Sequence, residues 1–420
     1  MRPAALRVSP MSLPDTNPEP TWLDRSTPPH TATLVLMTGL AALNMNMILP
    51  SLPSLAVWFE TDYAMVALAV SAYLALTAIL QLIIGPLSDR YGRRPVVLVS
   101  LVIFLVGTLG CIFATSIGAF LFWRMVQACI ASAMALSRAV VRDTVGPDEA
   151  ASRIGYITMG MSVSPMIAPM LGGFLDQSFG WQSVFVTTFI LGLGVFWLSW
   201  ADMGETNRHR SASFAVQFAA YPELSRSRRF WGYTATATCA SGAFFAFLGG
   251  GPWVATEVLG MSPARLGFFF GFIALGYMVG NFLSGRFTGA VGMNRMMLLG
   301  SLVATSGMLL ATALFAAGLQ TPLAFFGSIL FVGLGNGLTL PSANAGIVSV
   351  RPHLAGSASG LSGALMIGGG AALAALAGAL LTPETGAWPL ILLMTISSAL
   401  GILAALDVIR TARARGELAA

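Results

Sequence analysis

Long apolar runs separated by short polar turns dominate this chain. A helix needs roughly 20 apolar residues to cross the hydrocarbon core of a bilayer, and twelve runs of about that length can be placed. They are expected near residues 32–52, 64–84, 96–115, 117–140, 154–175, 181–201, 231–253, 264–285, 296–317, 323–346, 355–381 and 387–408. The pattern predicts an all-α integral membrane protein with twelve transmembrane helices.

One long polar stretch, residues 202–229, divides the twelve runs into two sets of six. We interpret it as a cytoplasmic linker between two six-helix bundles, residues 31–201 and 230–408. The segment Leu87–Tyr91 (LSDRY) has an echo at Leu283–Phe287 (LSGRF), and repeated halves are a transporter architecture. Residues 1–30 are polar and rich in proline, which predicts a disordered cytoplasmic tail. Residues 409–420 are expected to form a second cytoplasmic tail.

Composition and charge support a membrane protein and indicate which side of the membrane each loop occupies. Of the 420 residues, 56% are hydrophobic and 9% are charged, against about 25% charged in soluble domains. All basic residues are arginine, and nearly all loop arginines fall on the side that holds both termini. That side is cytoplasmic by the positive-inside rule, so the net charge of +5 implies no nucleic-acid partner. We expect a multi-pass protein of the cytoplasmic (inner) membrane with both termini in the cytoplasm.

No cofactor or metal site is predicted. The three cysteines lie inside apolar runs without ligand spacing, and the three histidines are scattered. The chain contains no lysine and no phosphate-binding loop, which argues against ATP hydrolysis. A proton gradient is the expected energy source.

The most informative polar interruption is GPLSDRYGRRP at residues 85–95. Its charges and glycines exclude it from hydrocarbon, so it must be a tight loop at a membrane face. It resembles the loop between helices 2 and 3 of the major facilitator superfamily. That resemblance implies that Asp89 approaches the N-terminal dipole of the helix beginning near Ala355 and latches the outward-facing state. The expected latch residues are Gly85, Asp89, Arg90, Gly92, Arg93, Arg94 and Asp143.

Arg124 is the one charge clearly inside an apolar run. Intramembrane arginine is costly and usually faces a cavity or a partner, and Gln127 shares its helix face. Two interpretations stay open: an arginine bound to backbone carbonyls of a neighbouring helix, or a role at the transport cavity. The R-x-x-Q pattern resembles the superfamily's fourth-helix motif, which is linked to proton coupling. Ala128 stands where that motif usually has glycine.

Residues 164–173 (SPMIAPMLGG) combine small residues with two prolines. Ser164 and Gly172 lie on a ridge of small residues suited to close helix packing, and Pro165 and Pro169 make the helix bendable. The run through Gly173 resembles the fifth-helix signature of drug antiporters. Residues 46–53 (NMILPSLP) resemble the D-M-Y-L-P-x-L-P of the bicyclomycin/chloramphenicol-resistance (Bcr/CflA) drug:proton antiporters, and the similarity covers nearly all of residues 32–408.

Asn46 departs from that family, which has an aspartate at this position. By the resemblance the aspartate is a candidate proton-binding group, whereas asparagine cannot titrate. Our coupling candidates are therefore Arg124, Glu257 and Asp143. The substrate-cavity candidates are polar or aromatic residues of the first, fourth, seventh, eighth and tenth runs: Asn44, Asn46, Gln127, Phe244, Phe247, Tyr277, Asn281 and Asn336.

The residues and the resemblance together predict a multidrug efflux transporter. We expect it to act as a monomer in the lipid bilayer, exporting small amphipathic drug-like compounds by alternating access in exchange for protons. An exporter of a specific metabolite, such as an amino acid or sugar, and an uncoupled facilitator stay open. An enzyme is not expected, because the apolar runs contain no Ser/His or paired-Asp constellation.

Overall fold

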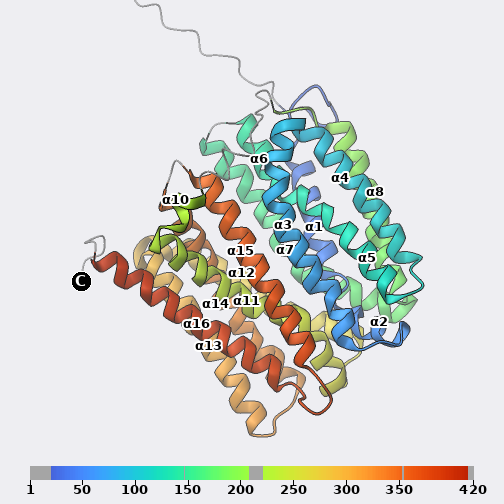
Figure 1. Cartoon of the computed structure of the whole chain (residues 1–420), viewed down its shortest axis with the longest axis vertical. Coiled ribbons are helices and arrows are strands. Elements are labelled where there is room, and N and C mark those ends of the chain that lie inside the picture. The colour runs from blue at the N-terminus through green and yellow to red at the C-terminus, as the bar shows by residue number, and fades with distance from the viewer. Residues whose placement is uncertain (1–19, 146, 208–220, 352–353, 415–420) are drawn as a thin grey trace, which may run out of the picture.

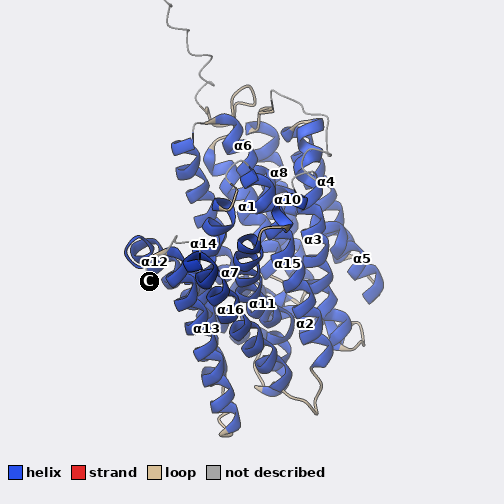
Figure 2. Cartoon of the chain, turned by 60° about the vertical axis from the view of Figure 1, so that its left-hand side comes forward, coloured by secondary structure: helices blue, strands red, loops and turns tan. Residues whose placement is uncertain are grey.

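The computed structural model describes residues 20–145, 147–207, 221–351 and 354–414, and these ranges form helices without strands (Figures 1 and 2). The N-terminal half contains α1 (Thr31–Asn46), η1 (Leu49–Ser51), α2 (Leu52–Trp58), α3 (Tyr63–Tyr91), α4 (Arg93–Ile112), α5 (Ile117–Gln127), η2 (Ala128–Ile130), α6 (Ala131–Thr144), α7 (Pro147–Phe179) and α8 (Gln182–Asp202). The C-terminal half contains α10 (Tyr221–Ser225), α11 (Arg228–Trp253), the π-turn η3 (Val254–Val258), α12 (Pro263–Val291), α13 (Met293–Ala316), α14 (Pro322–Ser349), α15 (Ala355–Leu380) and α16 (Trp388–Ala414).

Each of the twelve predicted runs coincides with one long helix or with consecutive helical segments. In the described residues, 10 helical segments are long and apolar enough to cross a membrane. The remaining two runs, α7 and α11, have the required length, and the count of twelve crossings stays a prediction. Two boundaries differ from expectation. The short helix α10 lies inside the predicted linker, and α16 continues past residue 408 to Ala414.

Two of the predicted runs are not continuous α-helices. The first is broken after Asn46, where Pro50 and Pro53 interrupt the helical hydrogen bonds and produce the 3-10 turn η1. The fourth is interrupted by the 3-10 turn η2, which begins directly after Gln127. The first break places Asn46 at the last position of α1.

The two halves repeat one helical plan. Helices α3 and α12 both contain 29 residues, and each ends at a glycine with positive φ, Gly92 at 103° and Gly292 at 87°. The sequence echo pairs Tyr91 with Phe287, whereas the two helices end at Tyr91 and Val291. The echo is therefore about one helical turn out of structural register.

In the C-terminal half, the backbones of α12 and α14 approach each other closely. A Cβ on Gly276 of α12 would lie 2.1 Å from the carbonyl oxygen of Leu330, and one on Gly333 of α14 would lie 2.0 Å from that of Ile273. Only glycine permits this approach at both positions, which is the small-residue mode of helix packing in membranes. Helices α12 and α14 therefore form one tightly packed unit.

Three hydrophobic cores define two ends of the molecule. We call the end with Gly92, Gly292 and residues 202–207 and 221–227 the linker end, and the opposite end, with residues 58–62, the α2 end. At the α2 end a single core contains residues of both halves, such as Leu52 and Phe120 with Phe247 and Phe325. At the linker end each half has a core of its own.

The N-terminal segment before α1 is attached to the end of α8. The carboxylate of Asp202 is fully buried and accepts hydrogen bonds from the backbone N–H of Leu23 (2.7 Å), the backbone N–H of His30 (2.9 Å) and the hydroxyl of Thr33 (2.6 Å). The expectation of disorder through residue 30 is therefore wrong for residues 20–30, because a buried carboxylate recruits those donors. Residues 1–19 lie outside the described residues.

Candidate functional site

The loop between α3 and α4 is a single-residue junction. Helix α3 ends when the backbone N–H of Gly92 donates to the carbonyl of Ser88 (2.9 Å), and α4 begins at the next residue, Arg93. Gly92 adopts φ 103° and ψ 153°, a conformation that residues with a Cβ rarely adopt. The predicted turn is confirmed at Gly92, whereas the rest of the predicted loop, residues 85–91 and 93–95, is helical.

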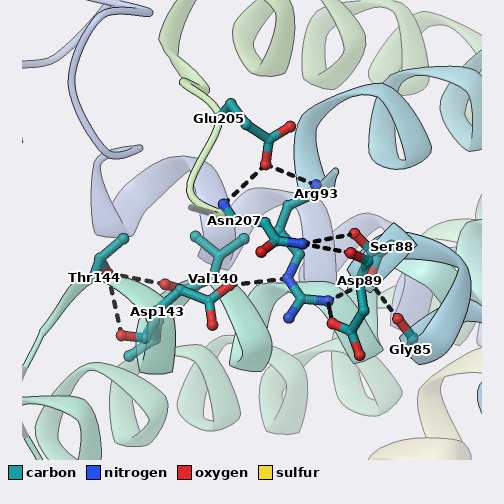
Figure 3. Close-up of polar contacts among 10 residues, drawn as sticks. Gly85, Ser88, Asp89, Arg93, Val140, Asp143, Thr144, Glu205 and Asn207 are labelled. Carbon is teal, nitrogen blue, oxygen red and sulfur yellow. Dashed lines mark hydrogen bonds and ion pairs between the residues drawn. The ribbon is translucent and has the colours of Figure 1, made fainter. Parts of the chain in front are cut away.

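Arg93 is the centre of the charge cluster at this junction (Figure 3). Its guanidinium pairs with Asp89 (Nη1–Oδ1, 2.6 Å) and with Asp143 at the end of α6 (Nε–Oδ2, 2.9 Å), and it also donates to the hydroxyl of Ser88. The hydroxyl of Ser88 in turn donates to the carbonyl of Gly85 (2.7 Å). Because Arg93 is only 8% exposed, losing a carboxylate partner would leave its buried charge uncompensated, so the cluster fixes how α3, α4 and α6 meet.

Two residues after α8 complete the cluster and were missed by sequence reasoning. The carboxylate of Glu205 accepts the backbone N–H of Arg93 (2.9 Å), at the positive end of the α4 dipole. The side-chain amide of Asn207 donates to the carbonyl of Asp89 (2.9 Å), and Arg94 donates to the carbonyl of Met203 (2.7 Å). In the sequence Glu205 is one of several acidic residues in an arginine-rich linker and Asn207 is an ordinary polar residue, so neither indicates a partner.

Of the predicted latch residues, Arg90 stands apart. It is exposed, and its guanidinium lies 5.5 Å from the ring centre of its neighbour Tyr91. Asp89 forms its ion pair within the N-terminal half, with Arg93. The latch between Asp89 and the start of α15 stays a prediction.

Arg124 lies in the core of the N-terminal half and is 1% exposed. Its guanidinium donates to the side-chain oxygens of Gln127 (2.7 Å) and Asn44 (3.2 Å), and to the backbone carbonyls of Asn44 (3.1 Å) and Ala69 (3.3 Å). It also lies 4.4 Å from the ring centre of Tyr73, a cation–π distance. Neutral oxygens and a ring therefore satisfy this buried cation, as the first of the two open interpretations expects.

The two asparagines of α1 have different surroundings. Asn44 contacts Arg124 and donates to the hydroxyl of Tyr73 (3.2 Å), whereas Asn46 donates to the carbonyl of Ala42 in its own helix (2.7 Å). Both are buried. Asn44 is therefore the α1 side chain that joins the arginine network.

The small residues of α7 lie between the two halves. The hydroxyl of Ser164 donates to the carbonyl of Gly39 in α1 (3.1 Å), and a Cβ on Gly172 would lie 1.9 Å from the carbonyl oxygen of Met47. Gly173 approaches the other half instead, since its Cβ would lie 2.2 Å from the carbonyl oxygen of Pro263. A Cβ on Gly267 of α12 would likewise lie 2.3 Å from the carbonyl oxygen of Pro169.

Close packing is thus found on both sides of α7, while Pro165 and Pro169 remain inside one continuous helix.

The cavity candidates of the C-terminal half differ in their burial. Phe247 is fully buried against Phe270, with ring centres 4.9 Å apart, so it is a core residue in this conformation. Asn336 is buried, and its Oδ1 accepts no hydrogen bond from the described residues. The remaining candidates, Phe244, Tyr277 and Asn281, are half-buried. Their contact with substrate stays a prediction.

The carboxylates differ sharply in burial. Glu257 is exposed at the α2 end, and Asp143 is paired with Arg93. The buried carboxylates of the described residues are Asp202, with three donors, and Asp176 in the last turn of α7. Asp176 is 7% exposed and accepts one hydrogen bond, from the hydroxyl of Ser54 (2.7 Å).

Comparison with known proteins assigns the family. The sequence profile of the Major Facilitator Superfamily matches residues 34–375. This chain belongs to the major facilitator superfamily. It is therefore a membrane transporter, and the resemblance stated from its sequence motifs is confirmed.

Relatives and solved structures agree with this assignment. The chain is 30% identical over 381 residues to YdgK, a superfamily transporter of Bacillus subtilis, covering 88% of this chain and 93% of that protein. It is 29% identical over 400 residues to a chloramphenicol resistance protein of Pseudomonas aeruginosa, covering 92% and 93%. The fold matches an inward-facing, unoccupied bacterial homolog of the human lysosomal transporter Spinster, with a TM-score of 0.69, 18% identity and coverage of 91% and 96%.

Proposed function

We propose that this transporter exports small amphipathic organic compounds by alternating access, in exchange for protons. The observation that carries the proposal is the distribution of cores: one core shared by both halves at the α2 end, and separate cores at the linker end. Two bodies joined at one end and separable at the other are what alternating access requires. The similarity to a chloramphenicol resistance protein supports a drug-like substrate.

The seam at the α2 end can open without breaking many polar bonds. Across it the hydroxyl of Tyr63 donates to the carbonyl of Gly249 (2.8 Å), and the backbone N–H of Ala264 donates to Oε1 of Gln177 (3.3 Å). Other contacts there join small residues, such as Ala67 with Gly378. Separating the halves there would expose the shared aromatic core rather than ion pairs. The free energy of opening at the α2 end would therefore depend mainly on the loss of apolar contacts between the two halves.

The residues along the proposed path favour neutral or zwitterionic substrates. Arg124 already has neutral acceptors, and no Asp or Glu occurs among the cavity candidates. A cationic substrate would find no compensating charge in such a cavity, which makes its desolvation costly. The preference for neutral or zwitterionic substrates thus rests on the residues proposed to line the cavity.

For the proton we assign a role to Asp176. Its ionised form is buried at the α2 end with one hydrogen bond and no cation within ion-pair distance among the described residues. Burying such a charge costs several kcal/mol, whereas the protonated acid is neutral. Protonation in the open state would remove that cost, so that closure of the α2 end becomes linked to proton binding.

The elements packed against Asp176 contribute few other charges. Helices α1 and α2 and the turn η1 carry no titratable group, and those of α6 and α8 lie at the linker end. Arg265 on α12 is exposed, as are Glu60 and Asp62 in the loop after α2. Among the described residues, therefore, no cation forms an ion pair with the buried carboxylate.

Transport into everted vesicles tests the proposal, with chloramphenicol and a lipophilic cation as substrates, with and without a proton gradient. We expect gradient-dependent uptake of chloramphenicol, loss of the gradient dependence in Asp176→Asn, and no change in the exposed control Asp62→Asn. Uptake that ignores the gradient in the unaltered protein would replace exchange by facilitated diffusion, as the untitratable Asn46 allows. If neither compound moves, a specific metabolite becomes the better hypothesis.

A further inference from the structure

A groove lies between α13 and α16 at the linker end of the C-terminal half. It has a volume of about 380 Å³ and is lined by Leu298 and Leu299 of α13, by Leu406 and Ile409 of α16, and by Arg295 and Arg413. Figure 1 shows the two helices side by side at the edge of the half. The groove thus has an apolar floor and two cationic side chains.

The groove continues a surface that faces lipid. Large apolar side chains are exposed along both helices, including Leu302 and Leu309 on α13 and Leu400 and Leu403 on α16. In a membrane protein such exposed apolar stripes contact acyl chains. The arginines mark the place where this stripe reaches the linker end, at the level expected for lipid headgroups.

The arginines of the groove have no partner among the residues that the structure describes. In the described ranges neither Arg295 nor Arg413 forms a hydrogen bond or ion pair, and both are exposed. Other arginines at this end do have partners: Arg228 pairs with Asp407, and Arg351 pairs with Glu223 (3.0 Å). Two guanidinium groups over one groove therefore retain their capacity to bind an anion.

The corresponding corner of the N-terminal half is closed by the chain itself. There Arg94, at the start of α4, donates to the carbonyls of Met203 and Trp200 at the end of α8. At the corner of α13 and α16 the two arginines line an open groove instead. Of these two corresponding corners, only the one in the C-terminal half has arginines without an acceptor among the described residues.

We propose that this groove binds an anionic phospholipid. Its phosphate would lie between Arg295 and Arg413, and an acyl chain would follow Leu298, Leu299 and Leu406 toward the exposed stripe. Charge complementarity and the amphipathic lining select this occupant, because a free anion would gain nothing from the leucines and a zwitterionic lipid would gain less from the arginines. The site is independent of substrate and proton exchange.

Native mass spectrometry of the purified full-length protein tests the proposal, after equilibration with equal amounts of phosphatidylglycerol and phosphatidylethanolamine. We expect selective retention of phosphatidylglycerol, and a fall of about tenfold in that selectivity in Arg295→Gln/Arg413→Gln. The matched control is Arg410→Gln, which removes an exposed arginine of α16 outside the groove. Intrinsic tryptophan fluorescence during heating verifies that the variants are folded.

Three results would overturn the site. Equal selectivity in the double variant would mean that the arginines are not involved. An equal loss in the Arg410 control would mean diffuse attraction rather than a groove. Selectivity that is absent in the full chain and arises only when residues 415–420 are deleted would assign the groove to the chain's own C-terminal segment.

Discussion

Replacing Gly92 by alanine perturbs two features of the charge cluster at once. The first is the backbone, since φ 103° and ψ 153° lie in a region that costs a residue with a Cβ about 1–3 kcal/mol. The second is Glu205, because the new Cβ would lie 2.3 Å from its Oε2. That carboxylate is the end of a flexible side chain, so it can move aside, but it then loses its hydrogen bonds.

The magnitude of the second effect follows from those bonds. Glu205 accepts the backbone N–H groups of Arg93 and Asn207, both at 2.9 Å. Each bond contributes about 0.5–1.5 kcal/mol net for an exposed carboxylate. Gly92→Ala should therefore cost about 1–3 kcal/mol beyond the backbone term.

The chain supplies a matched control in Gly292. It ends α12 at φ 87° and ψ 142°, close to the conformation of Gly92, but no atom lies within 4 Å of a Cβ built there. Gly292→Ala should therefore incur the backbone cost alone. Thermal unfolding of the detergent-solubilised protein, followed by the fluorescence of its 9 tryptophans, compares the two variants.

We expect Gly92→Ala to lower Tm more than Gly292→Ala does. The difference should disappear in a Glu205→Ala background, because the carboxylate is then absent and the two changes become equivalent. Equal Tm shifts of the two single variants in the unaltered background would refute the role of Glu205.

Three further changes test other parts of the structure. Gly333→Ala should destabilise the protein by about 1–3 kcal/mol, because the new Cβ would collide with the carbonyl oxygen of Ile273. Gly271→Ala, with open space around its Cβ, should not destabilise it, and thermal unfolding compares the two variants. Arg124→Met should cost about 2–4 kcal/mol, since it leaves buried oxygens without donors, and an unchanged Tm would contradict the network described for it. Asp202→Asn should accelerate tryptic cleavage after Arg25, because the amide cannot retain all three donors, and cleavage at the original rate would show that the segment is held by other contacts.

Hydropathy and charge alone determined the helical class and the positions of the long helices, and they located the break between α3 and α4 within residues 85–95. The hydrocarbon core of a bilayer offers no hydrogen-bond partners, so each spanning helix must satisfy its own backbone groups and contain few charges. Both requirements can be read from the local sequence. The ridge on α7 was also predictable, because small residues at four-residue spacing share one helix face.

The partners of individual side chains were decided only by the tertiary structure. Position along α1 could not distinguish Asn44 from Asn46 as the neighbour of Arg124, since that depends on helix rotation within the bundle. The contact between Arg93 and Glu205 joins residues 112 positions apart, and hydropathy carries no information on such pairs.

The same reason explains the buried Asp176 and the groove between α13 and α16. Asp176 of α7 meets Ser54 of α2, and the groove joins side chains of α13 and α16, so each feature depends on how separate helices pack. The amino-acid sequence by itself thus determined which segments enter the membrane and which charges remain outside. The tertiary structure decided which of those charges meet a partner, because side-chain contacts depend on the tilt, rotation and depth at which close-packed helices come to rest.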